Sequence, residues 1–491
     1  MSVWNETKNL DGEQISMEKT SFFGIDFGTT SSAVVEIYLD TDGRPQTVKH
    51  GDAWDRPIPS DVAIDRATEE IYTGREAKDR RQVLSKRCVY IPSIKMKMGS
   101  DVSFPTEHKV WKPVDVAAEV FRRLKAETEG RMTQAVVAIP IDFTPEKRRT
   151  VRRAAQMAGI EITSFVSEPT AAFFANYDQL KACANVVVFD WGGGTLDVSV
   201  LHHHEGRVDE LATKGLGIAG NDIDHKLAER IHAKFCQKKG MQVALEDMPP
   251  ESRDLLLNKA EAAKIRFAEE DHPQVSVNRY GKLGIVRTQL DGRSFDSLIR
   301  SEIDKAMQVT MEAIADAELT ETTIDAVLMV GGSSGLFAIQ DAMRQKFGED
   351  RIVLPEESMW NVGEGAARLA RSGGTYHSNQ EIAVKLHGGG TYAFLKPGED
   401  ITTFQRQATF ALVDATQQAN IVMCGSADIH DFVVKPLKTY SFLEEKVTLT
   451  ATITRDLVFE LRGRSNYRAD SGDVLWQYNR LKFYYALPKE D

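Results

Sequence analysis

The feature that most limits how this chain can fold is a motif that occurs twice. The segments GIDFGTTSSAVV at 24–35 and VFDWGGGTLDVSV at 188–200 each contain an apolar strand, then Asp, Gly and Thr, then a second β-type run. Small residues after the Asp let backbone N–H groups approach an anion, and the Thr hydroxyls add donors. One copy alone could equally be a glycine-rich turn with a solvated Asp. Two matching copies predict two related lobes, each with a hairpin that cradles phosphate groups.

Two common nucleotide-binding motifs do not account for these hairpins. The pattern G-x-x-x-x-G-K-[ST] is absent, and no helix directly follows either hairpin, so the dinucleotide fingerprint fails too. Asp26, Asp190 and Asp197 supply hard oxygen ligands, which predicts a magnesium ion held largely through water.

A third segment, AVLMVGGSSGL at 326–336, adds a weaker signal. A buried strand there leads into Gly331, Gly332 and Ser333 and then into a helix. This arrangement offers backbone amides and a flat glycine surface to a ligand.

The order of β-type and helical segments predicts the fold class. Short β-type runs alternate with longer helical ones from 21 to about 371, which indicates α/β layers. KVTLTATIT at 446–454 instead alternates apolar residues with Thr, as a half-buried antiparallel strand does, and ATFALV at 408–413 and LKFYYAL at 481–487 are similar. We therefore predict four parts: a disordered extension (1–20), a nucleotide-binding domain (21–371), a linker (372–385) and a small all-β sandwich domain (386–491).

Composition narrows the possible partners and compartment. The 491 residues include 61 Lys+Arg and 72 Asp+Glu, a net charge of −11, which argues against nucleic acid as the main ligand. Four scattered cysteines without a C-x-x-C pair indicate a reducing compartment. Without a signal peptide or a long apolar run, the chain is expected to be cytoplasmic and to have no membrane partner.

Several motifs resemble one known family. GIDFGTTSS, VAIPIDFTPEKRR, SEPTAAFFANY, FDWGGGTLDVSV and LMVGGSSGL occur in the order and roughly the spacing of the DnaK-type heat-shock chaperones, within the actin, hexokinase and heat-shock ATPase superfamily. The resemblance spans about 22–371, and the β tail resembles the family's peptide-binding domain less specifically. It implies a two-lobed actin-like ATPase domain. It also implies ATP or ADP and Mg²⁺ as cofactors, with K⁺ as an open alternative.

The resemblance also implies the site residues. The first phosphate hairpin contains Asp26, Gly28, Thr29 and Thr30, and the second contains Asp190, Gly192, Gly193, Gly194, Thr195 and Asp197. Further nucleotide-binding residues are Gly220, Glu261, Lys264, Gly331, Gly332 and Ser333. The resemblance implies four catalytic residues, Lys95, Glu168, Asp190 and Thr195. It also implies that Asp26, Asp190 and Asp197 hold the metal ion through water.

These residue types suit slow phosphoryl transfer. Its loose transition state needs positioning and charge stabilisation more than covalent help. We expect Lys95 and Glu168 to act on the attacking water. Pro140 and Arg148 match residues that pass the nucleotide state to the peptide domain.

The sequence also departs from the family pattern. Gly335 replaces the usual Arg of the adenosine motif, the stretch near Met359 lacks an expected Asp, and Ser164 stands where an Arg for docking J-proteins is usual. The linker offers only Ile382, Val384 and Leu386 as apolar residues. Because the sequence ends at Asp491, the helical lid over bound peptide is expected to be missing.

Three functions remain open at this point. The first is an ATP-driven chaperone or remodeller that binds extended segments of client proteins, with J-protein and exchange-factor partners undecided. The residues from His387 to Thr391 fall near the family's first peptide-contacting loop. The second is a small-molecule kinase, and the third is a nucleotide sensor or assembly protein.

Overall fold

The computed structural model describes residues 20–426 and 429–487. The predicted disordered extension therefore lies outside the described residues, apart from Thr20. The first lobe is built on a sheet with strand order β11-β10-β1-β2-β3. Its strands are β1 (Ser21–Asp26), β2 (Ser31–Leu39), β3 (Pro45–His50), β10 (Gln134–Ile139) and β11 (Glu161–Ser167).

Helices cover both faces of the first sheet. The helices α3 (Pro113–Glu127) and α4 (Pro145–Met157) share one apolar core with it. On the other face, α11 (Asn361–Ser372) lies so close to β1 that a side chain at Gly24 would overlap the backbone of Ala367. A sheet buried on both faces needs apolar residues at successive positions, as β2 has.

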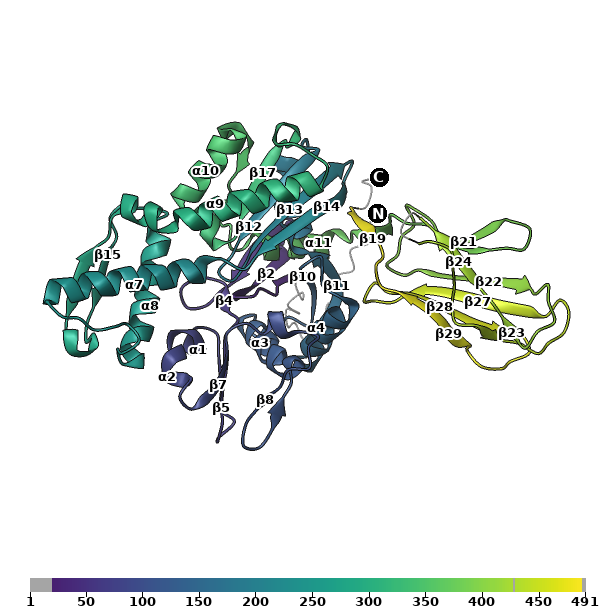
Figure 1. Ribbon diagram of the computed structural model, residues 1–491, viewed down its shortest axis with the longest axis horizontal. Helices are drawn as coiled ribbons and strands as arrows, with labels where there is room; N and C mark the ends of the chain where they lie inside the picture. The colour runs from purple at the N-terminus through teal and green to yellow at the C-terminus, as the bar shows by residue number, and fades with distance from the viewer. Residues whose placement is uncertain (1–19, 427–428, 488–491) are drawn as a thin grey trace, which may run out of the picture.

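The second lobe repeats the strand arrangement of the first. Its sheet has the order β18-β17-β12-β13-β14-β30-β19 (Figure 1). The strands are β12 (Asn185–Trp191), β13 (Leu196–His204), β14 (Arg207–Leu216), β17 (Ala326–Val330), β18 (Ile352–Val353), β19 (Thr375–Ser378) and β30 (Phe483–Ala486). In both lobes the repeated motif forms an antiparallel hairpin with a parallel strand beside it, β10 or β17. The paired motif thus does form two matching hairpins.

Four longer helices belong to the second lobe. They are α7 (Gly220–Lys239), α8 (Pro250–Arg266), α9 (Gly292–Asp316) and α10 (Phe337–Phe347). Within residues 20–426 and 429–487, no helix combines the length and the apolar character needed to cross a bilayer.

The C-terminal strands form two further four-stranded sheets, which we call the β region (382–478). One sheet has the order β21-β20-β24-β25 and the other β22-β27-β28-β29. The strands are β20 (Ile382–Lys385), β21 (Thr391–Leu395), β22 (Gln405–Ala411), β24 (Val422–Gly425), β25 (Phe432–Val433), β27 (Lys446–Ile453), β28 (Phe459–Ser465) and β29 (Asp473–Tyr478). As the alternation predicted, Val447, Leu449, Ala451 and Ile453 are buried.

The segment expected to be a linker, 372–385, contains two strands. β20 belongs to the β region, whereas β19 lies at the edge of the second-lobe sheet. LKFYYAL also differs from expectation, because its strand β30 leaves the β region and inserts between β14 and β19. Tyr485 explains this position: it is buried, and its ring lies 5.5 Å from Phe174 and 5.3 Å from Tyr376.

A second contact joins the β region to the first lobe. The turn between β27 and β28 rests on α4, where Arg148 and Arg152 donate to the carbonyls of Asp456 and Arg455, both at 2.9 Å. Figure 1 shows the β region projecting to one side of the two lobes, with β19 and β30 at the junction. The β region is therefore docked on both lobes.

The packing of α11 against α5 (Glu168–Ala175) gives a test of this fold. Gly365→Ala in α11 would stabilise an isolated helix by about 1 kcal/mol. Here the added Cβ would overlap the carbonyl of Ala171, and such overpacking costs about 1–3 kcal/mol. We expect a lower melting midpoint by thermal denaturation.

Gly217→Ala is the control, since its Cβ would have no atom within 4 Å and its midpoint should not fall. A Gly365→Ala variant at least as stable as the wild type would contradict the packing of α5 on α11.

Candidate functional site

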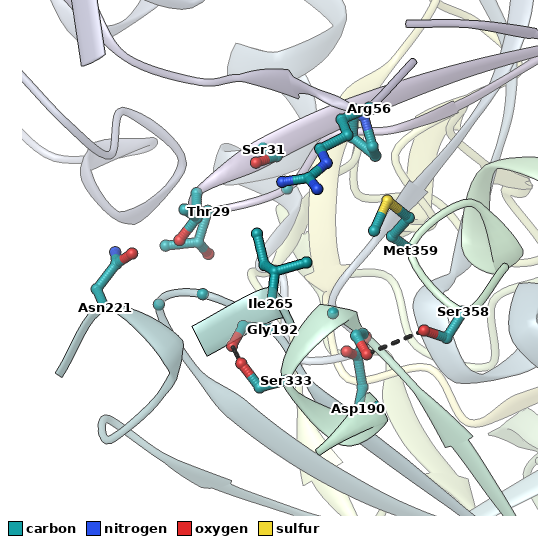
Figure 2. Close-up of a pocket in the computed structure, with 18 of the residues that line it drawn as sticks. Thr29, Ser31, Arg56, Asp190, Gly192, Asn221, Ile265, Ser333, Ser358 and Met359 are labelled. Carbon is teal, nitrogen blue, oxygen red and sulfur yellow. Dashed lines mark hydrogen bonds between the residues drawn. The ribbon is translucent and has the colours of Figure 1, made fainter. Parts of the chain in front are cut away.

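A cavity of about 410 Å³ lies between the two lobes, within the usual range for small-molecule sites. In Figure 2, Thr29, Ser31 and Arg56 from the first lobe face Gly192, Ser333 and Asp190 from the second. With one exception, every sequence-predicted site residue lines this cavity. They are Asp26, Gly28, Thr29, Thr30, Lys95, Glu168, Asp190, Gly192, Gly193, Gly194, Thr195, Asp197, Glu261, Lys264, Gly331, Gly332 and Ser333.

The tips of the two hairpins almost touch. A Cβ at Gly193 would lie 2.7 Å from Thr30 Cγ2, so only glycine fits at this point. Ser60 braces the first tip by donating from its hydroxyl to the carbonyl of Gly28 at 2.9 Å. In the second tip, the backbone N–H of Gly192 donates to the carbonyl of Thr195 at 3.0 Å. Both tips are therefore held in place by the protein itself.

Buried carboxylates surround one lysine at the floor of the cavity. Lys95, in the short helix Lys95–Lys97, is 5% exposed and donates from Nζ to Glu168 Oε1. Burial raises the pKa of Asp26 to about 6 and that of Glu168 to about 7, although Lys95 opposes both shifts. Burial also raises the pKa of Asp190 and of Asp197. Four carboxyl groups and one ammonium leave an excess of negative charge, which a bound cation would offset.

The end of the cavity near α8 has its own buried ion pair. Lys264 Nζ donates to Asp224 Oδ2 and to the carbonyl of Gly220, both at 2.9 Å. Gly220 is the exception among the predicted site residues, because it lies behind Lys264 and not on the cavity wall. Ser333 Oγ donates to the carbonyl of Gly192 at 3.0 Å, which ties the third glycine segment to the second hairpin.

An ion pair on the wall of the cavity also bridges the two lobes. Lys78, in α1 (Arg75–Asp79), donates to Glu261 Oε1 at 2.8 Å. Beside it, Asp254 of α8 accepts from the backbone N–H of Gln82 at 2.9 Å. These contacts hold α1 and α2 (Arg81–Leu84) of the first lobe against α8 of the second.

Three residues that the sequence did not predict as site residues also line the cavity: Lys78, Asp224 and Arg56. Lys78 and Arg56 belong to no motif in the sequence. Asp224 lies four residues after Gly220, on the same side of α7, so helical spacing could have indicated it. Gly335 and Met359, where the sequence departs from the family pattern, also line the cavity.

The interlobe ion pair yields a prediction about stability and pH. Burial acts to raise the pKa of Glu261, but the charge and hydrogen bond of Lys78, together with the charges of Lys264 and Arg75, outweigh burial and lower the pKa from 4.5 to about 2. The ionised carboxylate thus stabilises the fold above pH 4.5, and this contribution is lost as the pH falls toward 2. Glu261→Gln should cost about 1–3 kcal/mol at pH 7. By chemical denaturation, the difference from wild type should stay constant down to about pH 5 and narrow below it.

Glu251→Gln on the same helix is the matched control. Glu251 pairs with Lys86 at 3.8 Å with both side chains mostly exposed, so the change should cost under about 0.5 kcal/mol. Equal losses for the two variants would contradict a special role for the Lys78–Glu261 pair.

Comparison with known protein families agrees with the geometry of the cavity. The family model described as Hsp70 protein matches residues 97–371, which is more than half of the chain. The match includes Glu168, the second hairpin and the segment from Gly331 to Ser333, whereas the first hairpin and Lys95 precede it. The resemblance to DnaK-type heat-shock ATPases is thereby confirmed, and the chain belongs to the Hsp70 protein family.

Proposed function

We propose that this protein binds ATP between the two lobes, hydrolyses it slowly and uses the nucleotide state to control the binding of extended protein segments by the β region. Members of the Hsp70 family are ATP-dependent chaperones, which supports the general activity. One observation carries the proposal: two glycine-rich hairpins and the Lys95–Glu168 pair meet in a single cavity. The fold class we propose is the actin-like, two-lobed ATPase domain followed by a β-sandwich domain.

The hairpins would bind the phosphate groups. Gly193 and Gly194 of the second hairpin and Thr29 and Thr30 of the first line the cavity, where they would offer backbone N–H groups and hydroxyls to the phosphates. Such donors, fixed in advance, bind an anion without the cost of reorganising. Glu261, Lys264 and the segment Gly331–Ser333 would then bracket the nucleoside, with Gly220 supporting Lys264 from behind.

Lys95 and Glu168 would act at the reacting end. The Lys95 ammonium can neutralise charge on the terminal phosphate and orient the attacking water. The Glu168 carboxylate can hold that water in line, with Asp190 and Thr195 completing its surroundings. Burial of these groups strengthens their electrostatic effect on the transition state.

The carboxylates of the cavity fit a magnesium ion. Asp26, Asp190 and Asp197 are buried beside one lysine, and burial raises the pKa of each carboxyl group because desolvation disfavours its charged form. A cation bound among them would favour the charged form. Among the described residues, no group of three His, Cys, Asp or Glu side chains is arranged to hold a metal directly. We propose that these residues hold Mg²⁺ through water, and Mg²⁺ would supply charge neutralisation and alignment of the phosphates.

The role of Lys95 can be tested by substitution. Lys95→Ala should lower the single-turnover rate of ATP hydrolysis by about 100-fold or more, because a preorganised charge is lost from the reacting end. The readout is release of radiolabelled phosphate from a preformed complex with Mg-ATP. Lys97→Ala, on the same short helix and exposed, is the matched control and should hydrolyse ATP normally. A normal rate for Lys95→Ala would show that Lys95 is not catalytic.

The chaperone part of the proposal predicts coupling between nucleotide and peptide. A fluorescent extended apolar peptide should dissociate faster in saturating Mg-ATP than in ADP, because two coupled sites change each other's affinity. The measurement is a stopped-flow dissociation rate, and Lys95→Ala with ATP separates the effect of binding from that of hydrolysis. No peptide binding in either state would contradict the chaperone function and favour a dedicated-partner ATPase or sensor. Phosphorylation of a sugar would instead indicate a small-molecule kinase.

A further inference from the structure

A buried carboxylate that the proposed mechanism does not use lies beside the first turn of α5. Glu210, on β14, accepts hydrogen bonds at Oε1 from the hydroxyls of Ser167 and of Thr170, the latter at 2.6 Å. Its other oxygen, Oε2, is buried and has no hydrogen-bond partner within the described residues. Burial raises the pKa of Glu210, and the two hydroxyls only partly oppose that shift. A buried carboxylate with one oxygen that lacks a hydrogen-bond partner lowers the stability of the fold. The presence of Glu210 at this position therefore needs an explanation.

The two hydroxyls belong to the helix turn that carries Glu168. Ser167 is the N-cap of α5, its Oγ accepts from the backbone N–H of Thr170 at 3.2 Å, and Glu168 is the first residue of the helix. A serine hydroxyl has a single hydrogen. Because this hydrogen is donated to Glu210, the Ser167 lone pairs remain available to the helix N–H. Glu210 thus fixes the cap that orients Glu168 toward Lys95.

The same cluster is in contact with the segment that leads to the β region. Tyr376 of β19 packs against Tyr485 with ring centroids 5.3 Å apart, and the ring of Tyr485 lies 5.5 Å from that of Phe174 in α5. Burial, Glu210 and Tyr485 raise the pKa of the Tyr376 hydroxyl, while Arg148 and a hydrogen bond with the backbone of Ser167 lower it. β19 is held there by β30, which pairs with β14 at Arg207 and Val208, just before Glu210. The group formed by Glu210, Ser167, Thr170 and Tyr376 therefore adjoins Glu168 on one side and the docked strands on the other.

We infer that Glu210 is a positioning residue, which holds the first turn of α5 so that Glu168 is correctly placed for hydrolysis, and that the docked Tyr376 is part of the same device. This inference rests on the proposed ATPase function. Neither residue lines the cavity, so both act through the helix cap and not on the nucleotide. The C-terminal strand β30 contributes indirectly, because it keeps β19 and Tyr376 against the sheet.

Two substitutions at Glu210 separate positioning from general stability. Glu210→Leu removes the acceptor from both hydroxyls and should lower the single-turnover rate of ATP hydrolysis by about 10- to 100-fold, the effect of misplacing a catalytic group by about 1 Å. Affinity for ATP should change by less than about twofold, because only the reacting geometry is disturbed. Glu210→Gln keeps an oxygen acceptor and should retain most of the rate. Tyr376→Phe should also slow hydrolysis, though less than Glu210→Leu.

Ser199→Ala is the matched control within the same sheet. Ser199 on β13 is buried and its hydroxyl pairs with the Thr213 hydroxyl of β14 at 3.0 Å. Within the described residues this hydroxyl makes no hydrogen bond to α5, so its loss should leave the rate unchanged. A normal rate for Glu210→Leu would overturn the inference. So would a loss of rate accompanied by an equal loss of ATP affinity and a matching fall in the melting midpoint, since these indicate a merely structural role.

Amide hydrogen exchange keeps this test separate from the test of the proposed function. If the wild type hydrolyses no ATP, the proposed function fails, but hydrogen exchange still reports whether Glu210 stabilises the N-cap of α5. Glu210→Leu should then speed exchange of the Thr170 amide relative to Glu210→Gln and the wild type, because the cap that protects it is loosened. Equal exchange in all three proteins would contradict the inference whatever the ATPase result.

Discussion

The burial of several carboxyl groups around Lys95 is the constraint on which the rest of the structure depends. Asp26 and Glu168 come from the first lobe and Asp190 and Asp197 from the second, so closing the lobes brings like charges together in a desolvated place. Such an arrangement is unfavourable by itself. The lobes stay closed because other contacts between them oppose this repulsion. These contacts are the Lys78–Glu261 ion pair, the hydrogen bond from the Gln82 backbone N–H to the Asp254 carboxylate, and the packing of the hairpin tips at Gly193.

Helix α5 connects that charged floor to the remainder of the molecule. It is only eight residues long, yet its first turn carries Glu168 and is tied to β14. Its middle packs against α11 so closely that Gly365 is needed, and Phe174 near its end contacts Tyr485 of β30. A single short helix thus touches the reacting end, the core of the first lobe and β30, the last strand of the described residues.

Local patterns in the sequence predicted the strands and hairpins but not the contacts between distant segments. The repeated Asp-x-Gly motif predicted both hairpins because strand, turn and return strand are adjacent in the chain. The alternation at 446–453 predicted a buried face for the same reason. The alternation in LKFYYAL predicts which face of the strand is apolar, but it does not predict which strand it pairs with. The insertion of β30 beside β14 could therefore not be predicted from the sequence. Lys78 and Arg56 were missed because their roles arise only when distant segments meet.

The position of β30 changes what kind of joint connects the β region to the lobes. The chain enters the β region from β19 and returns through β30, and these two strands are hydrogen-bonded neighbours. Both ends of the β region are therefore attached through the paired strands β19 and β30. Such a joint permits the β region to bend about a single axis relative to the lobes and resists its free rotation. Loss of the short β14–β30 pairing, two residues on each side, would convert that hinge into a loose tether and lower the local concentration of the β region at α4.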